Sequence, residues 1–252
     1  MACKRMRELR VVHYRLGEFV SARGVRGYTV NGGFADHVIA DSRYAARIPD
    51  GLTSAAAAPI VCAGITTYKG LKQTEARPGQ WVAIVGVGGL GHLAVQYAKA
   101  MGLQVIAVDV SDEKLQLARK LGVVLTINSR TQDAVSVINK EVGGAHGVLI
   151  TAPSVEAFHQ GVAMTRRRGT CTLVGLPPGE FPLQIFDTVL RGITIRGSHV
   201  GTRADMREAL SLAASRGISA SVELQPLEKI NEVLDRLRHV KVQGRVVLDF
   251  AR

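Results

Sequence analysis

A glycine-rich stretch carries the clearest chemistry in this chain. Residues 86–91 read Gly-Val-Gly-Gly-Leu-Gly, the GxGxxG pattern of loops that bind dinucleotide phosphates. Gly86 would permit a tight turn, Gly88 would let the backbone approach a pyrophosphate, and Gly91 would let the next helix pack closely. The helix N-terminus would add free N–H groups and the positive end of a dipole. The predicted cofactor-binding residues of this loop are Gly86, Gly88, Gly89, Leu90 and Gly91.

A carboxylate stands where a ribose would lie. Asp109 follows Gly91 by 18 residues and ends an apolar run over 104–109. A carboxylate there can accept hydrogen bonds from both ribose hydroxyls of NAD, and it would repel the 2′-phosphate of NADP. Lys114, five residues further on, could reach the same ribose. The competing interpretation is that Asp109 only caps a loop; combined with the glycine loop, it predicts NAD as the cofactor.

One cysteine raises the question of a metal. The three cysteines are Cys3, Cys62 and Cys171, and they are far apart with no CxxC pair. This spacing predicts neither a disulfide framework nor a close-spaced zinc knot. Cys62 begins a segment that can form an amphipathic helix. It is either a small buried hydrophobe or one arm of a metal site whose other arms lie elsewhere.

Apolar runs that alternate with helical patterns must position these groups. Runs of strand length occupy 81–86, 104–109, 124–128, 147–152 and 170–175. Helical patterns occupy 88–102, 111–122, 131–144 and 154–169, with Ser111 as a candidate N-cap and Gly122 as a stop. Strands that are apolar throughout and alternate with helices are typical of a parallel sheet covered on both faces. We therefore predict an α/β fold with a Rossmann-type, doubly wound parallel sheet.

The flanking segments differ from this pattern. Residues 31–33 read Asn-Gly-Gly, a hairpin signal, and 34–40 alternate as in a half-buried strand that a turn at 49–51 follows. After the sheet come residues 193–200, which read ITIRGSHV, and a helical pattern at 203–217. The tail, 226–250, predicts one more helix and a final strand.

Charge and composition limit the function classes. The 252-residue chain has a formal net charge of +11, and residues 1–26 contain seven Lys or Arg against two Glu, with no clean apolar period. No aromatic-rich RNA motif or recognition-helix pattern accompanies this charge, so we expect no nucleic-acid partner. No apolar run is long enough to cross a membrane, and no signal-peptide core follows the basic start. We expect a cytoplasmic protein without a membrane partner.

Four stretches together resemble one family. They read GYTVNGGFADHVIAD, PIVCAGITTYKGLKQTEARPGQWVAIVGVGGLGHLAVQYAKAMG, GLPPGEFPLQIFD and GSHVGTRADMREAL. Over about residues 27–252 the chain resembles the zinc-dependent alcohol dehydrogenases of the medium-chain dehydrogenase/reductase superfamily, bacterial propanol-preferring type. The resemblance implies an atypical leader at 1–26, a remnant of the GroES-like catalytic domain at 27–58, an NAD-binding domain at 59–215, and a return to the catalytic domain at 216–252.

The resemblance also bears on zinc. In that family a cysteine, a histidine and a second cysteine hold a catalytic zinc, and Cys62 matches the last of these. The other two ligands belong to the N-terminal barrel, most of which this chain lacks, as it lacks the four-cysteine structural site. His13 and His37 match no ligand motif of the family, and His92 is interpreted as structural. The zinc site is therefore expected to be incomplete.

Other positions carry over residue by residue. Thr66 matches the threonine that packs near the nicotinamide ring and is the candidate catalytic residue. Arg245 matches the arginine that pairs with the pyrophosphate, the competing interpretation being a surface charge beside a last strand. Residues that match backbone positions at the carboxamide end are Val174, Leu176, Ser198 and Val200.

Three functions are therefore compared. The first is reversible hydride transfer between a primary or secondary alcohol and NAD, with zinc as Lewis acid, in a homo-oligomer (a dimer or tetramer) that takes a small alcohol or aldehyde. The second is a catalytically inactive NAD-binding protein. The third is a zinc-free quinone-reductase-like enzyme. Asp109 argues against it because that branch prefers NADPH, and Cys62 also argues against it.

Overall fold

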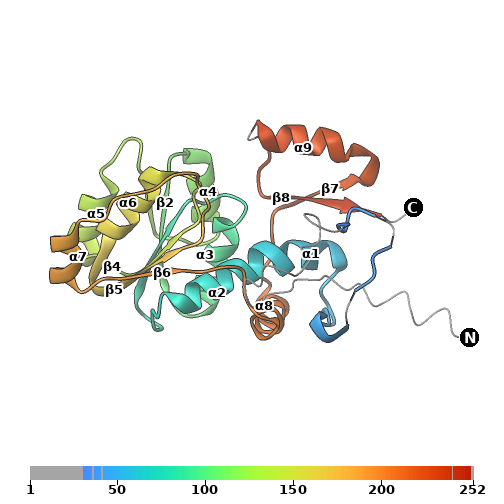
Figure 1. The fold of residues 1–252 in the computed structure, drawn as a ribbon, viewed down its shortest axis with the longest axis horizontal. Helices are drawn as coiled ribbons and strands as arrows, with labels where there is room; N and C mark the ends of the chain where they lie inside the picture. Colours follow the sequence, from blue (N-terminus) through green and yellow to red (C-terminus); the bar gives the residue numbers. More distant parts are fainter. Residues whose placement is uncertain (1–30, 36, 41, 240, 251–252) are drawn as a thin grey trace, which may run out of the picture.

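A six-stranded parallel sheet forms the centre of the protein. The computed structural model describes residues 31–35, 37–40, 42–239 and 241–250. The strand order is β3-β2-β1-β4-β5-β6, and every neighbouring pair is parallel (Figure 1). The six strands are β1 (Trp81–Val85), β2 (Gln104–Asp109), β3 (Leu125–Asn128), β4 (Ala145–Ile150), β5 (Thr165–Leu173) and β6 (Thr194–Gly197). The predicted doubly wound sheet is confirmed.

Helices cover both faces of this sheet. On one face of the sheet, alternate strand residues such as Val82 and Ile84 pack against five α-helices. On the other face, Ala83 and Val85 belong to a core that includes two α-helices. On the first face lie α1 (Ser54–Pro59), α2 (Ile65–Gln73), α3 (Gly91–Ala100), α4 (Asp112–Lys120) and α8 (Arg203–Arg216). On the second face lie α5 (Ala134–Val142) and α6 (Val155–Met164). Burial on both faces explains why the strand sequences are apolar throughout.

Helix ends follow local sequence signals. Asp133 caps α5 by accepting the N–H groups of Val135 and Ser136, and Gly143 ends that helix in the left-handed region. Ser111 is the N-cap of α4 by position, although its side chain makes no capping hydrogen bond. These boundaries lie within a few residues of the predicted ones.

One boundary prediction was wrong. The helical pattern predicted over 154–169 ends at Met164, and Thr165–Arg168 belong to β5. Met and Arg favour helices in isolation, but here Thr165 pairs with Ala145 of β4, with a register shift after that pair. Tertiary pairing therefore overrides local propensity in this segment.

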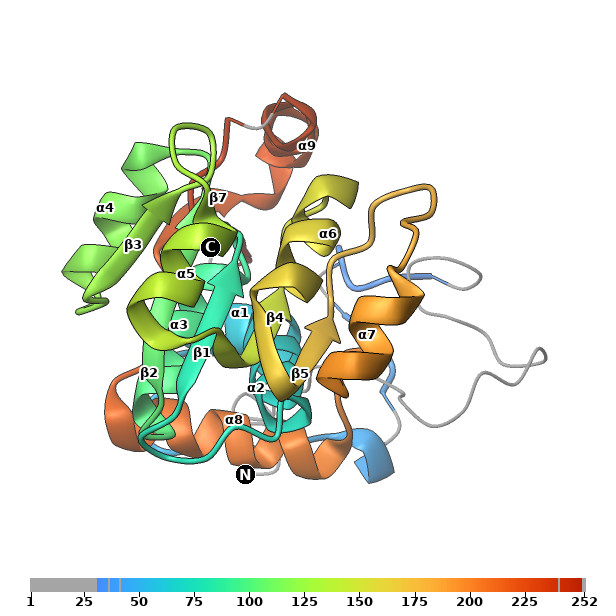
Figure 2. The same ribbon diagram turned by 90° about the vertical axis from the view of Figure 1, so that its left-hand side faces the viewer.

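A second, smaller unit follows the sheet. Strands β7 (Val222–Pro226) and β8 (Arg245–Asp249) pair in parallel and are joined through α9 (Ile230–Arg238). Arg236 of α9 donates to both carboxylate oxygens of Glu223, each at 2.7 Å. Figure 1 shows this unit beside α1, at the end of the molecule opposite to α7 (Ile185–Arg191). Figure 2 shows α7 at the β5 side of the sheet.

The segment before α1 departs from the prediction. Residues 34–35 and 37–40 form no strand, and Phe34 and Ile39 are 67% and 88% exposed. Alternating hydrophobicity gives a strand only when another strand pairs with it, and none in the described part of the chain does. The turn at 49–51 is confirmed, because Leu52 N–H donates to Pro49 O at 3.2 Å. The predictions for residues 1–26, including Cys3 and His13, lie outside the described residues.

The length and apolar character of the helices decide whether any of them could cross a bilayer. Among the residues that the structure describes, no helix has both the length and the apolar character needed to span a membrane.

Candidate functional site

The glycine loop lies at the carboxyl end of β1, where it turns into α3. Gly86 has φ +96°, and a Cβ on it would lie 2.8 Å from the backbone nitrogen of Ala152. A Cβ on Gly91 would lie only 1.8 Å from the carbonyl oxygen of Gly86, so this position accepts glycine alone. By contrast, a Cβ on Gly88 would meet no atom within 4 Å. Gly86 and Gly91 thus shape the loop, and Gly88 leaves open space in front of the backbone.

Asp109, at the end of β2, faces this loop. It is 7% exposed, and its Oδ2 accepts the N–H of Val87 at 2.7 Å. Its Oδ1 accepts the N–H of Ser111 at 3.0 Å and lies 3.9 Å from Nζ of Lys114. Asp109 therefore caps a loop, and it also stands beside the glycine loop. Each carboxylate oxygen keeps a second lone pair for a further donor.

Arg245 reaches the same loop from the second unit. A Cβ on Gly89 would lie 3.2 Å from Nη1 of Arg245 and 3.1 Å from the carbonyl oxygen of Gly244. Gly244 has φ +69°, and a Cβ there would lie 2.3 Å from the carbonyl oxygen of Ser221. Two glycines therefore let the start of β8 approach the loop closely. Arg245 is half-buried at the start of β8 and lies against the glycine loop.

The carboxyl ends of β5 and β6 bring the carboxamide candidates to the same edge of the sheet. Val174 is buried and Leu176 is exposed. Ser198 N–H donates to Leu173 O at 2.9 Å, while the buried Ser198 hydroxyl has no partner among the described residues. Val200 has φ +43°, which is rare for a β-branched residue. Backbone in an uncommon conformation often borders a binding site.

Thr66 and Cys62 lie one helical turn apart. Cys62 belongs to a π-helical turn, Ile60–Gly64, and is half-buried, whereas Thr66 is buried in α2. A Cβ on Gly201 would lie 2.8 Å from Cγ1 of Ile65, so the segment after β6 packs against this helix. π-helical turns occur frequently at functional sites.

The described residues do not complete a zinc site at Cys62. No group of three His, Cys, Asp or Glu side chains lies close enough to hold a metal within the described ranges. His37 lies in an exposed loop, and His92 is buried against the glycine loop. A catalytic zinc site needs three protein ligands, so Cys62 with these neighbours does not fit one.

Two functional positions were missed by sequence reasoning. The Oγ1 of Thr151, just after β4, donates to Gly86 O at 2.7 Å and so supports the tight turn. A Cβ on Gly175, after β5, would lie 2.4 Å from Ala152 O. Their only signal is that each follows an apolar strand, where ligands bind in open α/β sheets.

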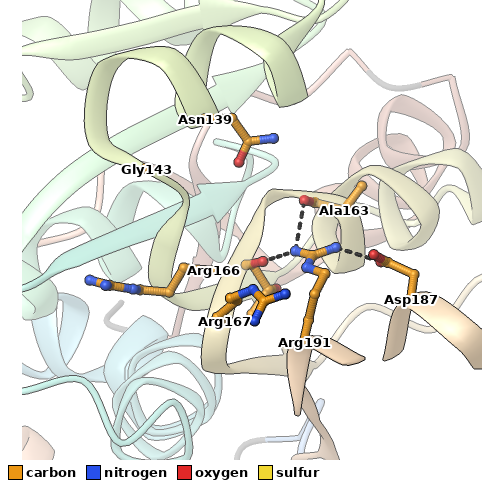
Figure 3. A pocket seen from close by; sticks show the side chains of 8 residues that line it. Asn139, Gly143, Ala163, Arg166, Arg167, Asp187 and Arg191 are labelled. Carbon is orange, nitrogen blue, oxygen red and sulfur yellow. Dashed lines mark hydrogen bonds and ion pairs between the residues drawn. The ribbon is translucent and has the colours of Figure 1, made fainter. Parts of the chain in front are cut away.

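A hollow in the surface lies away from the glycine loop. A cavity of about 430 Å³ is lined by Asn139, Gly143, Ala163, Thr165, Arg166, Arg167, Asp187 and Arg191 (Figure 3). It is at the amino ends of β4 and β5, the edge of the sheet opposite to the glycine loop. Arg191 donates to Asp187 and to the carbonyls of Ala163 and Thr165, so both of its terminal nitrogens are engaged within the protein. We assign this cavity no role in cofactor binding.

Comparison with known proteins agrees with this geometry. Residues 89–215 match the family described as zinc-binding dehydrogenase. The chain belongs to that family. An alcohol dehydrogenase of Moraxella sp. (strain TAE123) is 54% identical over 224 residues, which cover 89% of this chain and 66% of that protein. The chain thus spans slightly less than two thirds of that relative.

Solved structures of an alcohol dehydrogenase and of a reductase share the fold. The alcohol dehydrogenase of Aeropyrum pernix matches with a TM-score of 0.81 and 32% identity, over 89% of this chain and 67% of that one. The acetophenone reductase of Geotrichum candidum, solved in complex with NAD, matches with a TM-score of 0.81 and 29% identity, over 92% and 67%.

Proposed function

We propose that this chain is the NAD-binding part of an alcohol dehydrogenase, which transfers hydride reversibly between a primary or secondary alcohol and NAD. One observation carries the proposal: the glycine loop, Asp109 and Arg245 converge at the carboxyl end of β1. Family membership and the named relatives support the same reaction. The substrate would be a small alcohol or the matching aldehyde or ketone.

The residues present suit the parts of a dinucleotide. When bound, NAD supplies the carbon that accepts hydride. The backbone at Gly88 borders open space for the pyrophosphate, and the guanidinium of Arg245 can bind phosphate oxygens in pairs. Asp109 would accept the ribose hydroxyls, with Lys114 beside it. Val174, Leu176, Ser198 and Val200 would line the carboxamide end, with Thr66 near the ring.

For zinc, the described residues include Cys62, but no group of three His, Cys, Asp or Glu side chains among them could hold the metal. This observation favours a second candidate function, a catalytically inactive NAD-binding protein. Measuring ethanol oxidation and zinc content on the same sample separates the two. Stoichiometric zinc with ordinary dehydrogenase turnover would support the first function, and NADH binding without turnover would support the second.

We further propose that the protein is a cytoplasmic homo-oligomer. The two cysteines that the structure describes, Cys62 and Cys171, are free thiols, which suits a reducing compartment. Strand β6 lies at an edge of the sheet, and α7 beside it exposes apolar side chains. Exposed sheet edges and apolar patches favour association between copies.

Fluorescence titration with NADH tests the cofactor proposal directly. Gly88→Ala is the informative variant, because a Cβ there meets nothing in the protein but would occupy space in front of the loop. We expect unchanged thermal unfolding and roughly tenfold or greater loss of NADH affinity, about 1.4 kcal/mol or more. Gly33→Ala, also in open space but far from the loop in sequence, is the matched control. No saturable NADH binding by the unsubstituted chain would refute the proposal.

A further inference from the structure

Side chains of helix α3 form hydrogen bonds with the backbone of the segment that leads into β7. His92 and Gln96 are four residues apart and so lie on the same helix face. Gln96 donates to Ser219 O at 2.8 Å and accepts Ser219 N–H at 3.1 Å. One turn earlier, Nε2 of His92 accepts the N–H of Ser221 at 3.3 Å. Two side chains of the cofactor-loop helix therefore fix the backbone of the second unit.

The hydrogen bonds define the protonation state of His92. The ring is 1% exposed, and its Nδ1 lies 2.8 Å from Gly88 O, which can only accept. Because Ser221 N–H can only donate, the tautomer with a proton on Nδ1 satisfies both partners. Burial lowers the pKa of His92, and the nearby charge of Arg245 acts in the same direction against the opposing effect of the Gly88 bond. At neutral pH the ring is therefore uncharged and bridges the loop and Ser221.

Ser221 in turn fixes Arg245. The carbonyl oxygen of Ser221 accepts the N–H of Arg245 at 2.8 Å, and the guanidinium of Arg245 lies against Gly89. The contacts therefore form a closed path that runs from Gly88 through His92, Ser221 and Arg245 and returns to the same loop at Gly89. The path crosses from the Rossmann sheet to the β7–β8 unit and back.

We propose that His92 is a positioning residue that holds Arg245 over the glycine loop, so that the guanidinium is already placed when the cofactor's pyrophosphate arrives. The proposal rests on the proposed function of this loop. A long cationic side chain loses rotational freedom on binding, and a fixed backbone beneath it reduces that cost. Deleting the His92 acceptor would remove the hydrogen bond to the Ser221 N–H. The start of β8, which is hydrogen-bonded to Ser221 through Arg245, would then be held less firmly.

Three substitutions separate positioning from simple packing. His92→Gln can still present an acceptor to Ser221, whereas His92→Asn reaches only Gly88 and His92→Leu reaches neither. We expect NADH affinity to fall roughly 5- to 30-fold in the Leu and Asn variants, the range for one or two lost hydrogen bonds. The Gln variant should stay within about threefold of the unsubstituted chain. His239→Leu, at an exposed histidine of the second unit, is the control.

A double-mutant cycle with Arg245→Met completes the test. If His92 acts through Arg245, His92→Leu should weaken NADH binding by less than about twofold in the Arg245→Met background. An equal loss in both backgrounds, or no loss in a folded His92→Leu variant, would overturn the proposal.

The two proposals fail in different ways. Absence of NADH binding in the unsubstituted chain would refute the proposed function. Amide hydrogen exchange at Ser221 and Arg245 still tests the positioning claim in that case. We expect faster exchange at both amides in the Leu and Asn variants and near-normal exchange with Gln. Unchanged exchange in all three would overturn the claim.

Discussion

At the scale of single residues, Asp109 caps a loop and is the proposed ribose acceptor, and one substitution can separate these two roles. Its oxygens accept the N–H groups of Val87 and Ser111, and its charge would repel a 2′-phosphate. Asp109→Asn keeps the size and one acceptor oxygen but removes the charge. We expect this variant to discriminate less against NADPH than the unsubstituted chain does. Fluorescence titration gives the dissociation constants of both cofactors, and the ratio of the NADPH value to the NADH value should fall roughly tenfold toward one.

The control for this prediction is Asp109→Gly, which also frees both N–H groups. This variant should also reduce the preference for NADH over NADPH. It should unfold at a lower temperature than Asp109→Asn, because the loop loses its cap. Equal affinity of the unsubstituted chain for both cofactors would contradict the assignment of Asp109 to the ribose.

The cysteines differ in accessibility, and this gives a second prediction. Burial raises the pKa of the Cys171 thiol to about 12, and that side chain is fully buried, whereas Cys62 is half-buried. Titration with a thiol reagent at pH 7.5 should therefore detect one reactive thiol per chain fewer in native Cys62→Ser than in the native unsubstituted chain. Cys171→Ser should change the count only after unfolding.

The metal content follows from the same residues. Because no group of three candidate ligands includes Cys62 among the described residues, the chain as printed should hold less than one tightly bound zinc per molecule. Plasma mass spectrometry after dialysis measures this. One zinc per chain that disappears in Cys62→Ser would show that ligands come from residues outside the described ranges or from another chain.

Local patterns explain which site residues sequence could predict. The glycine loop and Asp109 depend on spacing within one strand–helix–strand unit, and the structure places them together. Arg245 lies more than 150 residues from Gly89 in sequence, and only a family resemblance pointed to it. The bond between His92 and Ser221 has no sequence signal at all, because long-range backbone contacts leave no periodicity.

At the scale of elements, the junction of α2 and α8 is held by a buried carboxylate. Asp205, 3% exposed, accepts the N–H and hydroxyl of Thr202 in a capping box and pairs with Lys72 at 3.0 Å. Burial opposes ionisation, but the hydrogen bonds from Thr202 and Lys72 prevail and keep the pKa of Asp205 below its usual value. The ionised form is therefore favoured by folding.

This lowered pKa predicts how stability varies with pH. The contribution of Asp205 is present above the unfolded-state pKa of about 3.9 and is lost as the pH falls through the lower folded-state pKa. At pH 7, Asp205→Asn should reduce the free energy of unfolding by about 2 kcal/mol in urea titrations. The difference between the two proteins should shrink below about pH 4. A difference that stays constant down to pH 3 would contradict this account.

Glu208→Gln is the matched control at this junction. Glu208 pairs with the same lysine at 2.8 Å, but its side chain is about half exposed. Exposed ion pairs contribute about 0–1 kcal/mol, so this variant should lose clearly less stability than Asp205→Asn.

Elements differ in how far sequence predicts them. The strands β1 to β4 are buried on both faces, so their apolar runs are visible without knowledge of their partners. The strand expected at 34–40 failed because alternation shows only that a strand could form there. Helix α7 and strand β7 were not predicted, since neither contains a fully buried residue and the usual periodic signal is weak.

At the scale of the whole molecule, α7 presents an exposed apolar face. Ile185, Phe186 and Val189 are 79%, 78% and 70% exposed, and no residue of α7 is buried. Figure 1 places this helix at the end of the molecule opposite to the β7–β8 unit. The neighbouring β6 pairs only with β5 in the described structure, so its outer edge is open. An open edge beside an apolar helix suits a two-fold contact between copies.

We therefore expect the chain to self-associate through this face. Sedimentation velocity should show a dimer or larger species that shifts toward monomer in the double variant Phe186→Ser/Val189→Ser. The control is Leu224→Ser/Leu237→Ser, which removes two exposed leucines from the β7–β8 unit, far from α7. If association were driven by the apolar surface of that unit instead, the control would dissociate and the α7 variant would not. A monodisperse monomer of the unsubstituted chain at micromolar concentration would contradict both contacts, since exposed apolar faces of this size favour association.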